Sequence, residues 1–146
     1  MAEFTPGQSA TVSKTISEAD IYAYAGISGD FNPLHVDAEF ARGARFGERI
    51  AHGMLTAGLI SAVLGMRLPG PGGIYLSQTL QFVNPVRIGD TITAKAEVTG
   101  YRPENRVLTL RTTCTNQRGQ TVVEGEAVLL VDRAREPVKD GVPPGP

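Results

Sequence analysis

The sequence is poor in the features that mark secreted, membrane-bound or nucleic-acid-binding proteins. Its single cysteine, Cys114, excludes an internal disulfide and a thiolate metal cluster, and it fits a reducing compartment. Its 14 basic and 15 acidic residues nearly balance, so no overall charge favours nucleic acid or an anionic membrane as a partner. The N-terminus lacks a basic segment followed by an apolar run, so we expect no signal peptide and a cytoplasmic location.

The uncharged segment 50–66 is too short and too polar for a membrane span. It has seventeen residues, including a histidine, a threonine, a serine and three glycines, whereas a span needs ~20 apolar residues. We interpret it as a buried helix. With 146 residues and 41% apolar content, the chain fits one domain with one core. The expected partner is a small molecule or a second copy of the chain.

The first half of the chain is predicted to be one short strand followed by helices. Ser17, with Asp20 three residues later, is typical of a helix N-cap, and this helix should stop near Gly29. Residues 37–42 indicate one or two further helical turns, and residues 43–49 a polar loop. A long apolar helix should then run from about residue 51 to 68. Because apolar residues cover most of its circumference, we expect it to be wrapped on several sides.

After Gly73 the apolar pattern changes to a period of two, which predicts strands. The alternating runs lie near residues 74–82, 91–98, 107–114 and 123–131. The connections are short, so the strands should be antiparallel. The small Ala94 and Ala96 leave room for a bulky element against the sheet. The predicted fold class is α+β, a single domain at residues 1–132 in which an antiparallel sheet is wrapped around the long helix. Residues 133–146, rich in proline, glycine and charge, are predicted to be a disordered tail.

Both histidines fall near one reactive segment, Gly29-Asp30-Phe31-Asn32-Pro33-Leu34-His35, which is followed by His52-Gly53-Met54. Pro33 has no backbone N–H and a fixed φ, so the segment should be a bent loop rather than the middle of a helix. Such a loop can aim the carboxylate of Asp30 and the imidazole of His35 at one water, which permits acid–base chemistry near neutral pH. The alternative is that these side chains only make local turns and caps.

Three motifs together resemble a known family. They are residues 28–37 (SGDFNPLHVD), 50–54 (IAHGM) and 84–90 (NPVRIGD). In this order and spacing the chain resembles, over residues 9–132, the (R)-specific enoyl-CoA hydratases of the MaoC-like group. The resemblance implies a hot-dog fold, a homodimer joined at sheet edges, and no cofactor. It also implies reversible (R)-specific hydration of trans-2-enoyl-CoA thioesters, in fatty acid or polyhydroxyalkanoate precursor metabolism.

The resemblance also assigns roles to residues. It places the catalytic pair on Asp30 and His35, and it makes Asn32 the amide that helps to hold the loop. Gly53 becomes the residue whose backbone N–H faces the thioester oxygen. First-turn N–H groups have no intrahelical partner and carry the positive end of the helix dipole, which independently favours the role of Gly53. His52 is interpreted as a structural neighbour.

Two further assignments stay open at this stage. Ser61, inside the apolar helix, either bonds the carbonyl four residues back or, as the resemblance suggests, supports the site by orienting Asp30. A metal site of Asp30, His35, His52 and Asp37 is conceivable from residue types, but the spacing fits no familiar pattern, and we expect no metal.

Three rival functions remain. A 3-hydroxyacyl-[acyl carrier protein] dehydratase would need a basic docking patch, and Arg42, Arg45 and Arg49 form the only such cluster, although we favour a solvated face as its explanation. A non-catalytic acyl-thioester binding protein would be favoured by loss of Asp30 or His35, and both are present. A hot-dog thioesterase is expected to carry a carboxylate on the central helix, where residues 56–68 contain no Asp or Glu.

Overall fold

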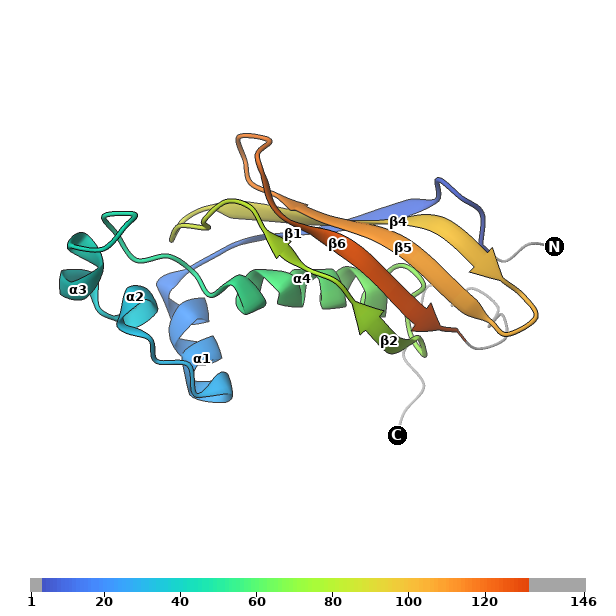
Figure 1. Cartoon of the computed structure of the whole chain (residues 1–146), viewed down its shortest axis with the longest axis horizontal. Coiled ribbons are helices and arrows are strands. Elements are labelled where there is room, and N and C mark those ends of the chain that lie inside the picture. Colours follow the sequence, from blue (N-terminus) through green and yellow to red (C-terminus); the bar gives the residue numbers. More distant parts are fainter. Residues whose placement is uncertain (1–3, 132–146) are drawn as a thin grey trace, which may run out of the picture.

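A curved antiparallel sheet and one enclosed helix form the body of this computed structural model, which describes residues 4–131. Three shorter helices gather at one end of the sheet (Figure 1). The elements, in chain order, are β1 (Ser9–Thr15), α1 (Glu18–Ser28), α2 (Pro33–Val36), α3 (Ala38–Arg42), α4 (Gly53–Met66), β2 (Ile74–Gln78), β3 (Gln81–Phe82), β4 (Thr91–Arg102), β5 (Val107–Thr115) and β6 (Thr121–Leu130). The predicted α+β class is confirmed. The predicted tail, 133–146, and the domain limit at residue 132 lie outside the described residues.

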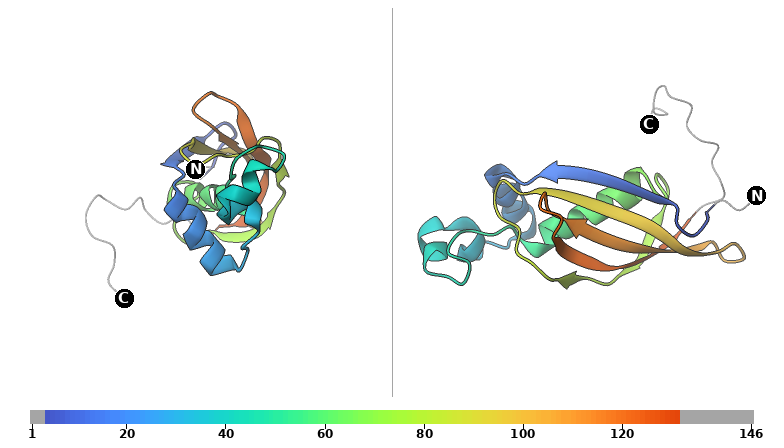
Figure 2. Two further views of the ribbon diagram at one scale, coloured as in Figure 1. Left: turned by 90° about the vertical axis from the view of Figure 1, so that its left-hand side faces the viewer. Right: turned by 90° about the horizontal axis from the view of Figure 1, so that it is seen from above.

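The sheet has the strand order β1-β4-β5-β6-β2, and β3 adds a short pairing to β6. All pairings are antiparallel. On β4 the predicted alternation is confirmed, because Ala94 and Ala96 are fully buried and face the core against which α4 packs. An end-on view shows the sheet curling around α4 (Figure 2). The small residues of β4 therefore position the central helix, and with it the N-terminus of that helix.

The predicted run 74–82 is not one strand. It is divided into β2 and β3, and the backbone of Thr79 between them pairs with Glu126 of β6. The division depends on Gly125 of β6, where an added Cβ would lie 1.8 Å from the carbonyl oxygen of Thr79. Only glycine permits this close backbone approach. The consequence for the site is that β3 brings Phe82 toward the start of α4.

The caps predicted for the first helices are confirmed. Ser17 and Asp20 exchange hydrogen bonds at the start of α1, and Gly29 ends that helix with a φ of 80°. The prediction for the following segment was partly wrong, because His35 lies on the one-turn helix α2 rather than on a loop. Pro33 starts this helix, where a missing N–H costs nothing, and the Asn32 side chain caps it by accepting a bond from the N–H of Leu34.

The helix α4 contacts β1, β4, β5 and β6, as the expected covering on several sides requires, but in a single chain one face of it is exposed. The exposed residues follow helical spacing and are mostly small: Met54, Gly58, Ser61, Gly65 and Met66. The sheet covers only the opposite face, which includes Ile60 and Leu64. Strand β2 beside the open face also exposes Ile74 and Leu76, which are 58% and 54% exposed. No helix within residues 4–131 is long and apolar enough to cross a membrane.

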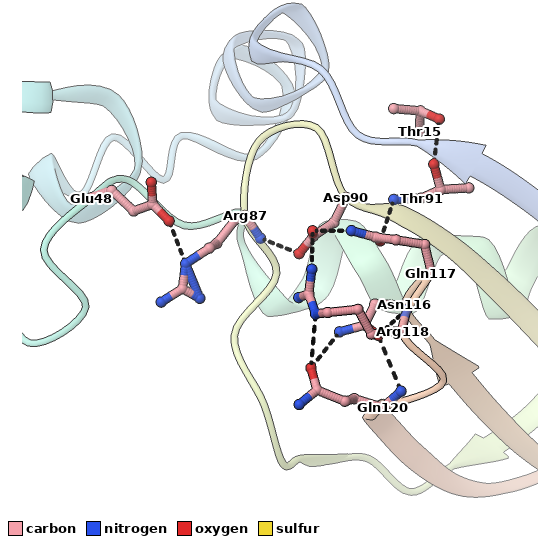
Figure 3. A network of polar contacts seen from close by, with 9 residues as sticks. All are labelled: Thr15, Glu48, Arg87, Asp90, Thr91, Asn116, Gln117, Arg118 and Gln120. Carbon is pink, nitrogen blue, oxygen red and sulfur yellow. Dashed lines mark hydrogen bonds and ion pairs between the residues drawn. The ribbon is translucent and has the colours of Figure 1, made fainter.

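A buried carboxylate, Asp90, joins the segment 84–90 to the turn between β5 and β6 (Figure 3). It accepts hydrogen bonds of 2.9 Å from the backbone N–H of Arg87 and from the side-chain amide of Gln117, and Arg118 lies 3.6 Å away. Burial alone would raise the pKa of Asp90, but these bonds and charges outweigh it and hold the pKa below its usual value. This part of the third sequence motif therefore has a structural role.

Candidate active site

The carboxylate of Asp30 is held just beyond the end of α1. The turn at Gly29 redirects the chain, and the backbone N–H of Asp30 donates to the hydroxyl of Ser28 at 3.1 Å. The Asp30 carboxylate in turn accepts a 3.1 Å bond from the backbone N–H of Asn32. Asn32 therefore holds the segment twice, through its own N–H and through its cap on α2. In a single chain the Asp30 side chain remains exposed and accessible to substrate.

The imidazole of His35 is buried and has one defined partner. Its Nδ1 lies 2.7 Å from the carbonyl oxygen of Ile50, and the side chain is only 8% exposed. A carbonyl oxygen can only accept, so Nδ1 must carry a proton. This bond fixes the ring orientation and leaves Nε2 as the nitrogen that can gain or lose a proton. The carbonyl of Ile50 is a site component that no side-chain motif in the sequence could indicate.

The imidazole of His52 is held through its other nitrogen, Nε2 instead of Nδ1. Its Nε2 lies 2.9 Å from the backbone carbonyl oxygen of Asp30, so this nitrogen is the protonated one. The ring is 2% exposed, and it stacks on His35 with ring centroids 4.0 Å apart and contacts Tyr24 on α1 at 4.6 Å. These contacts fit the expected structural role, since His52 holds the backbone of Asp30 and supports the ring of His35.

The side chains of Asp30, His35 and His52 therefore converge, with one ligand-type atom of each within 4.8 Å of the others. Within residues 4–131 these are the three groups that could surround a metal ion. Asp37, which residue type also suggested, is not part of the group, because its carboxylate caps α3 by accepting from the N–H groups of Glu39 and Phe40. The two histidine rings already use one nitrogen each on a backbone carbonyl. What the cluster presents is a carboxylate within 4.8 Å of a ring nitrogen of His35.

Gly53 begins α4, where no side chain caps the helix. Its backbone N–H makes no hydrogen bond within residues 4–131, as expected for the first turn of a helix. A Cβ added to Gly53 would lie 2.7 Å from two atoms of the Phe82 ring, so any larger residue here would displace that ring or the start of α4. Sequence reasoning missed Phe82, because only the pairing of β3 with β6 brings it to this helix.

A cavity of about 710 Å³ opens beside these groups, and His35 and Gly53 both line it. Its other walls come from the loop before α4, from the first turns of α4 and from residues 82–86. A second cavity of about 430 Å³ continues along the exposed face of α4 and shares Met54 with the first. A volume of several hundred cubic ångströms suits a small organic ligand.

Ser61 lies in the second cavity and makes neither of the bonds that we considered for it. Its hydroxyl bonds no residue within 4–131, neither the carbonyl four residues back nor Asp30. It is two turns along α4 from Gly53, on the exposed face, so within one chain it lies too far along the helix to orient Asp30. Ser61 is instead part of the wall of the second cavity.

The predicted arginine cluster is also divided. Arg42 pairs with Glu39 on α3 at 2.7 Å, and Arg49 pairs with Glu18 on α1 at 2.9 Å. Only Arg45 reaches the cavity wall. The three arginines therefore do not form a continuous basic patch of the kind that a carrier protein would need.

Comparisons with known proteins agree with this geometry. The family described as MaoC like domain matches residues 3–120. An (R)-specific enoyl-CoA hydratase of Rhodospirillum rubrum is 60% identical over 125 residues, which cover 86% of each chain. The solved structure of an (R)-hydratase from A. caviae involved in PHA biosynthesis superposes with a TM-score of 0.87 at 45% identity, covering 90% of this chain and all of that one.

A more distant relative is a mitochondrial 3-hydroxyacyl-[acyl-carrier-protein] dehydratase of Solanum lycopersicum, 38% identical over 120 residues that cover 81% of this chain and 72% of its own. The hot-dog fold that the sequence motifs implied is thus confirmed by a solved neighbour that covers nearly the whole described chain. The segments that carry those motifs form one site in this structure. The chain belongs to the MaoC-like family.

Proposed function

We propose that this protein is an (R)-specific enoyl-CoA hydratase, a hydro-lyase that adds water reversibly to trans-2-enoyl-CoA to give (R)-3-hydroxyacyl-CoA. The observation that carries the proposal is that the Asp30 carboxylate lies within 4.8 Å of a ring nitrogen of His35, which lines a cavity together with Gly53. Similarity to enzymes of this name at up to 60% identity supports it.

The N-terminus of α4 activates the substrate. The thioester carbonyl accepts a hydrogen bond from the backbone N–H of Gly53, which has no other partner within residues 4–131. The bond withdraws electron density from the β-carbon and stabilises the enolate that forms as water adds. A donor placed at such an oxyanion contributes about 2.7 to 4 kcal/mol in other enzymes.

The carboxylate of Asp30 and the imidazole of His35 transfer the protons. The step starts from the Asp30 carboxylate and a His35 ring that carries a proton on both nitrogens. Asp30 takes a proton from water as the water oxygen bonds to the β-carbon, and His35 delivers its Nε2 proton to the α-carbon. Nδ1 cannot take part because its proton stays on the carbonyl of Ile50. The step leaves Asp30 protonated and His35 neutral, and passage of that proton back to Nε2 restores the pair. Dehydration of a 3-hydroxyacyl thioester uses the same groups in reverse.

We also propose that the protein acts as a homodimer. The apolar edge strand β2 and the exposed face of α4 lie side by side, and an exposed apolar edge of this kind invites pairing. The other edge, β1, is polar and carries Lys14, so β2 is the edge that we expect a second copy to cover. A cytoplasmic location fits the single cysteine, Cys114, which is buried and unpaired.

The direct test is the loss of crotonyl-CoA absorbance on hydration, with the handedness of the 3-hydroxybutyryl product determined. An (R) product supports the proposal, and an (S) product or no turnover rejects it. Comparison of crotonyl-CoA with the crotonyl thioester of acyl carrier protein separates the two hydratase functions. A non-catalytic acyl-thioester binding protein would bind both without turnover.

A further inference from the structure

Of the arginines that flank the catalytic cavity, some are already ion-paired with a carboxylate and one is not. Three arginines on the flanking segments are ion-paired: Arg42 with Glu39, Arg49 with Glu18, and Arg87 with Glu48. Arg45 makes no hydrogen bond or ion pair with any residue in the part of the chain that the structure describes, and it is an exposed residue that lines the cavity. Its guanidinium group is therefore available to a ligand.

The wall of the cavity offers nothing that could neutralise this charge. Of its fourteen lining residues only His35 and Arg45 are ionisable, and none is acidic. Most of the others are apolar, such as Phe46 and Val86. A guanidinium group is always charged, and its planar set of donors matches the oxygens of a phosphate in pairs. The cavity is therefore suited to a ligand that carries an anionic group at the end where Arg45 lies.

The segment that carries Arg45 is fixed in place. Glu48, three residues along the same loop, is ion-paired with Arg87, whose backbone N–H is bound by Asp90 (Figure 3). The loop then rejoins the body at Ala51, whose N–H donates to the carbonyl of Val86 at 2.7 Å. This loop projects beyond the N-terminus of α4, away from the sheet (Figure 1). Anchoring at these points lowers the entropy lost when the side chain binds a ligand.

We propose that Arg45 forms a phosphate subsite that holds the phosphorylated arm of the thioester substrate. This inference rests on the proposed function for the identity of the thioester. With the carbonyl at Gly53, the reacting end of the substrate is uncharged, so its phosphates are the part that calls for a cation. The arm would leave Gly53 toward the loop at 43–49. The 4′-phosphate of phosphopantetheine is common to CoA and to carrier proteins, whereas the nucleotide phosphates belong to CoA alone.

The test is binding of saturated thioesters, which cannot be hydrated. Isothermal titration calorimetry compares the wild type, Arg45→Ala and the matched control Arg42→Ala, which removes an exposed arginine paired on α3. The ligands are butyryl-CoA, butyryl-4′-phosphopantetheine and butyryl-pantetheine. We expect Arg45→Ala to raise the Kd of butyryl-CoA about tenfold and to leave that of butyryl-pantetheine unchanged, as loss of one charge-assisted contact requires. Arg42→Ala should bind all three as the wild type does.

The pattern across ligands identifies the phosphate. A tenfold effect on both phosphorylated ligands assigns Arg45 to the 4′-phosphate, and an effect on butyryl-CoA alone assigns it to the nucleotide phosphates. With crotonyl-CoA the same variant should raise KM and keep kcat within about twofold. Equal Kd values for wild type and Arg45→Ala with butyryl-CoA would overturn the inference, as would an equal loss with butyryl-pantetheine or no binding of butyryl-CoA at all. Failure of the proposed function is separate, since it would appear as wild-type binding of butyryl-CoA without turnover of crotonyl-CoA.

Discussion

A single methyl group at position 53 tests the contact between α4 and β3. In Gly53→Ala the new Cβ would lie 2.7 Å from the Phe82 ring, so the ring or the start of α4 must move by about 0.7 Å to reach an ordinary contact of 3.4 Å. Phe82 is half exposed, so it has room to move outward. We expect the free energy of unfolding to fall by about 1 kcal/mol at most, because the overpacking is partly offset by the higher helix propensity of alanine.

The effect on activity should be much larger than the effect on stability. A displacement approaching 1 Å at a group that positions the reacting atoms lowers the rate by up to about 10²-fold. We therefore expect kcat/KM for crotonyl-CoA to fall by about 10- to 100-fold in Gly53→Ala. Initial rates measured by absorbance, together with urea unfolding, give both quantities on the same preparation.

The matched control is Gly26→Ala in α1, where an added Cβ has no atom within 4 Å. This helix-interior change should raise stability by up to about 1 kcal/mol and leave kcat/KM unchanged. Phe82→Ala in the Gly53→Ala background should restore part of the activity if displacement of the ring causes the loss. Wild-type kcat/KM in Gly53→Ala would refute the reasoning that the start of α4 binds the thioester oxygen.

Three further predictions concern other parts of the chain. His52→Gln should retain more activity than His35→Gln, since the first changes a ring that holds a backbone carbonyl and the second removes the free Nε2; the reverse order would show that the two imidazoles are assigned the wrong way round. Burial raises the pKa of Cys114 to about 12, so its thiol should not react with iodoacetamide at pH 8 until the protein is unfolded, and mass spectrometry showing rapid labelling of the native protein would contradict this. Light scattering at micromolar concentration should give about twice the 15.5 kDa of one chain, and a fully active monomer would reject the homodimer.

Local features of the fold could be predicted from the sequence because their causes lie within a few residues. Ser17 and Asp20 are three residues apart and cap α1 as predicted. The alternation on β4 reports burial directly, since adjacent side chains point to opposite faces of a sheet. The Asp30 and His35 pair follows the same rule, because the two residues are five positions apart and the four residues between them include a proline, which limits how far apart the two side chains can lie.

Features that depend on distant segments could not be predicted in this way. The runs 74–82 and 107–114 both read as strands in the sequence, which does not show that strand order places β5 inside the sheet and leaves β2 at the edge. The exposed face of α4 could not be predicted from helical periodicity. The pattern shows that apolar residues cover most of the circumference, but it does not show which side the sheet leaves open. The partner of the His35 Nδ1 is a backbone carbonyl fifteen residues away, and backbone atoms leave no mark in a side-chain pattern.

The central claim is that Asp30 and His35 act as one proton-transfer pair, and turnover of a short enoyl-CoA by three variants tests it most directly. We expect Asp30→Asn and His35→Ala each to lower kcat by at least ~10²-fold with the fold intact, because each removes one end of the relay. The double variant should be little worse than either single one, since residues that act as a unit are not additive. Near wild-type turnover in either single variant would contradict the account.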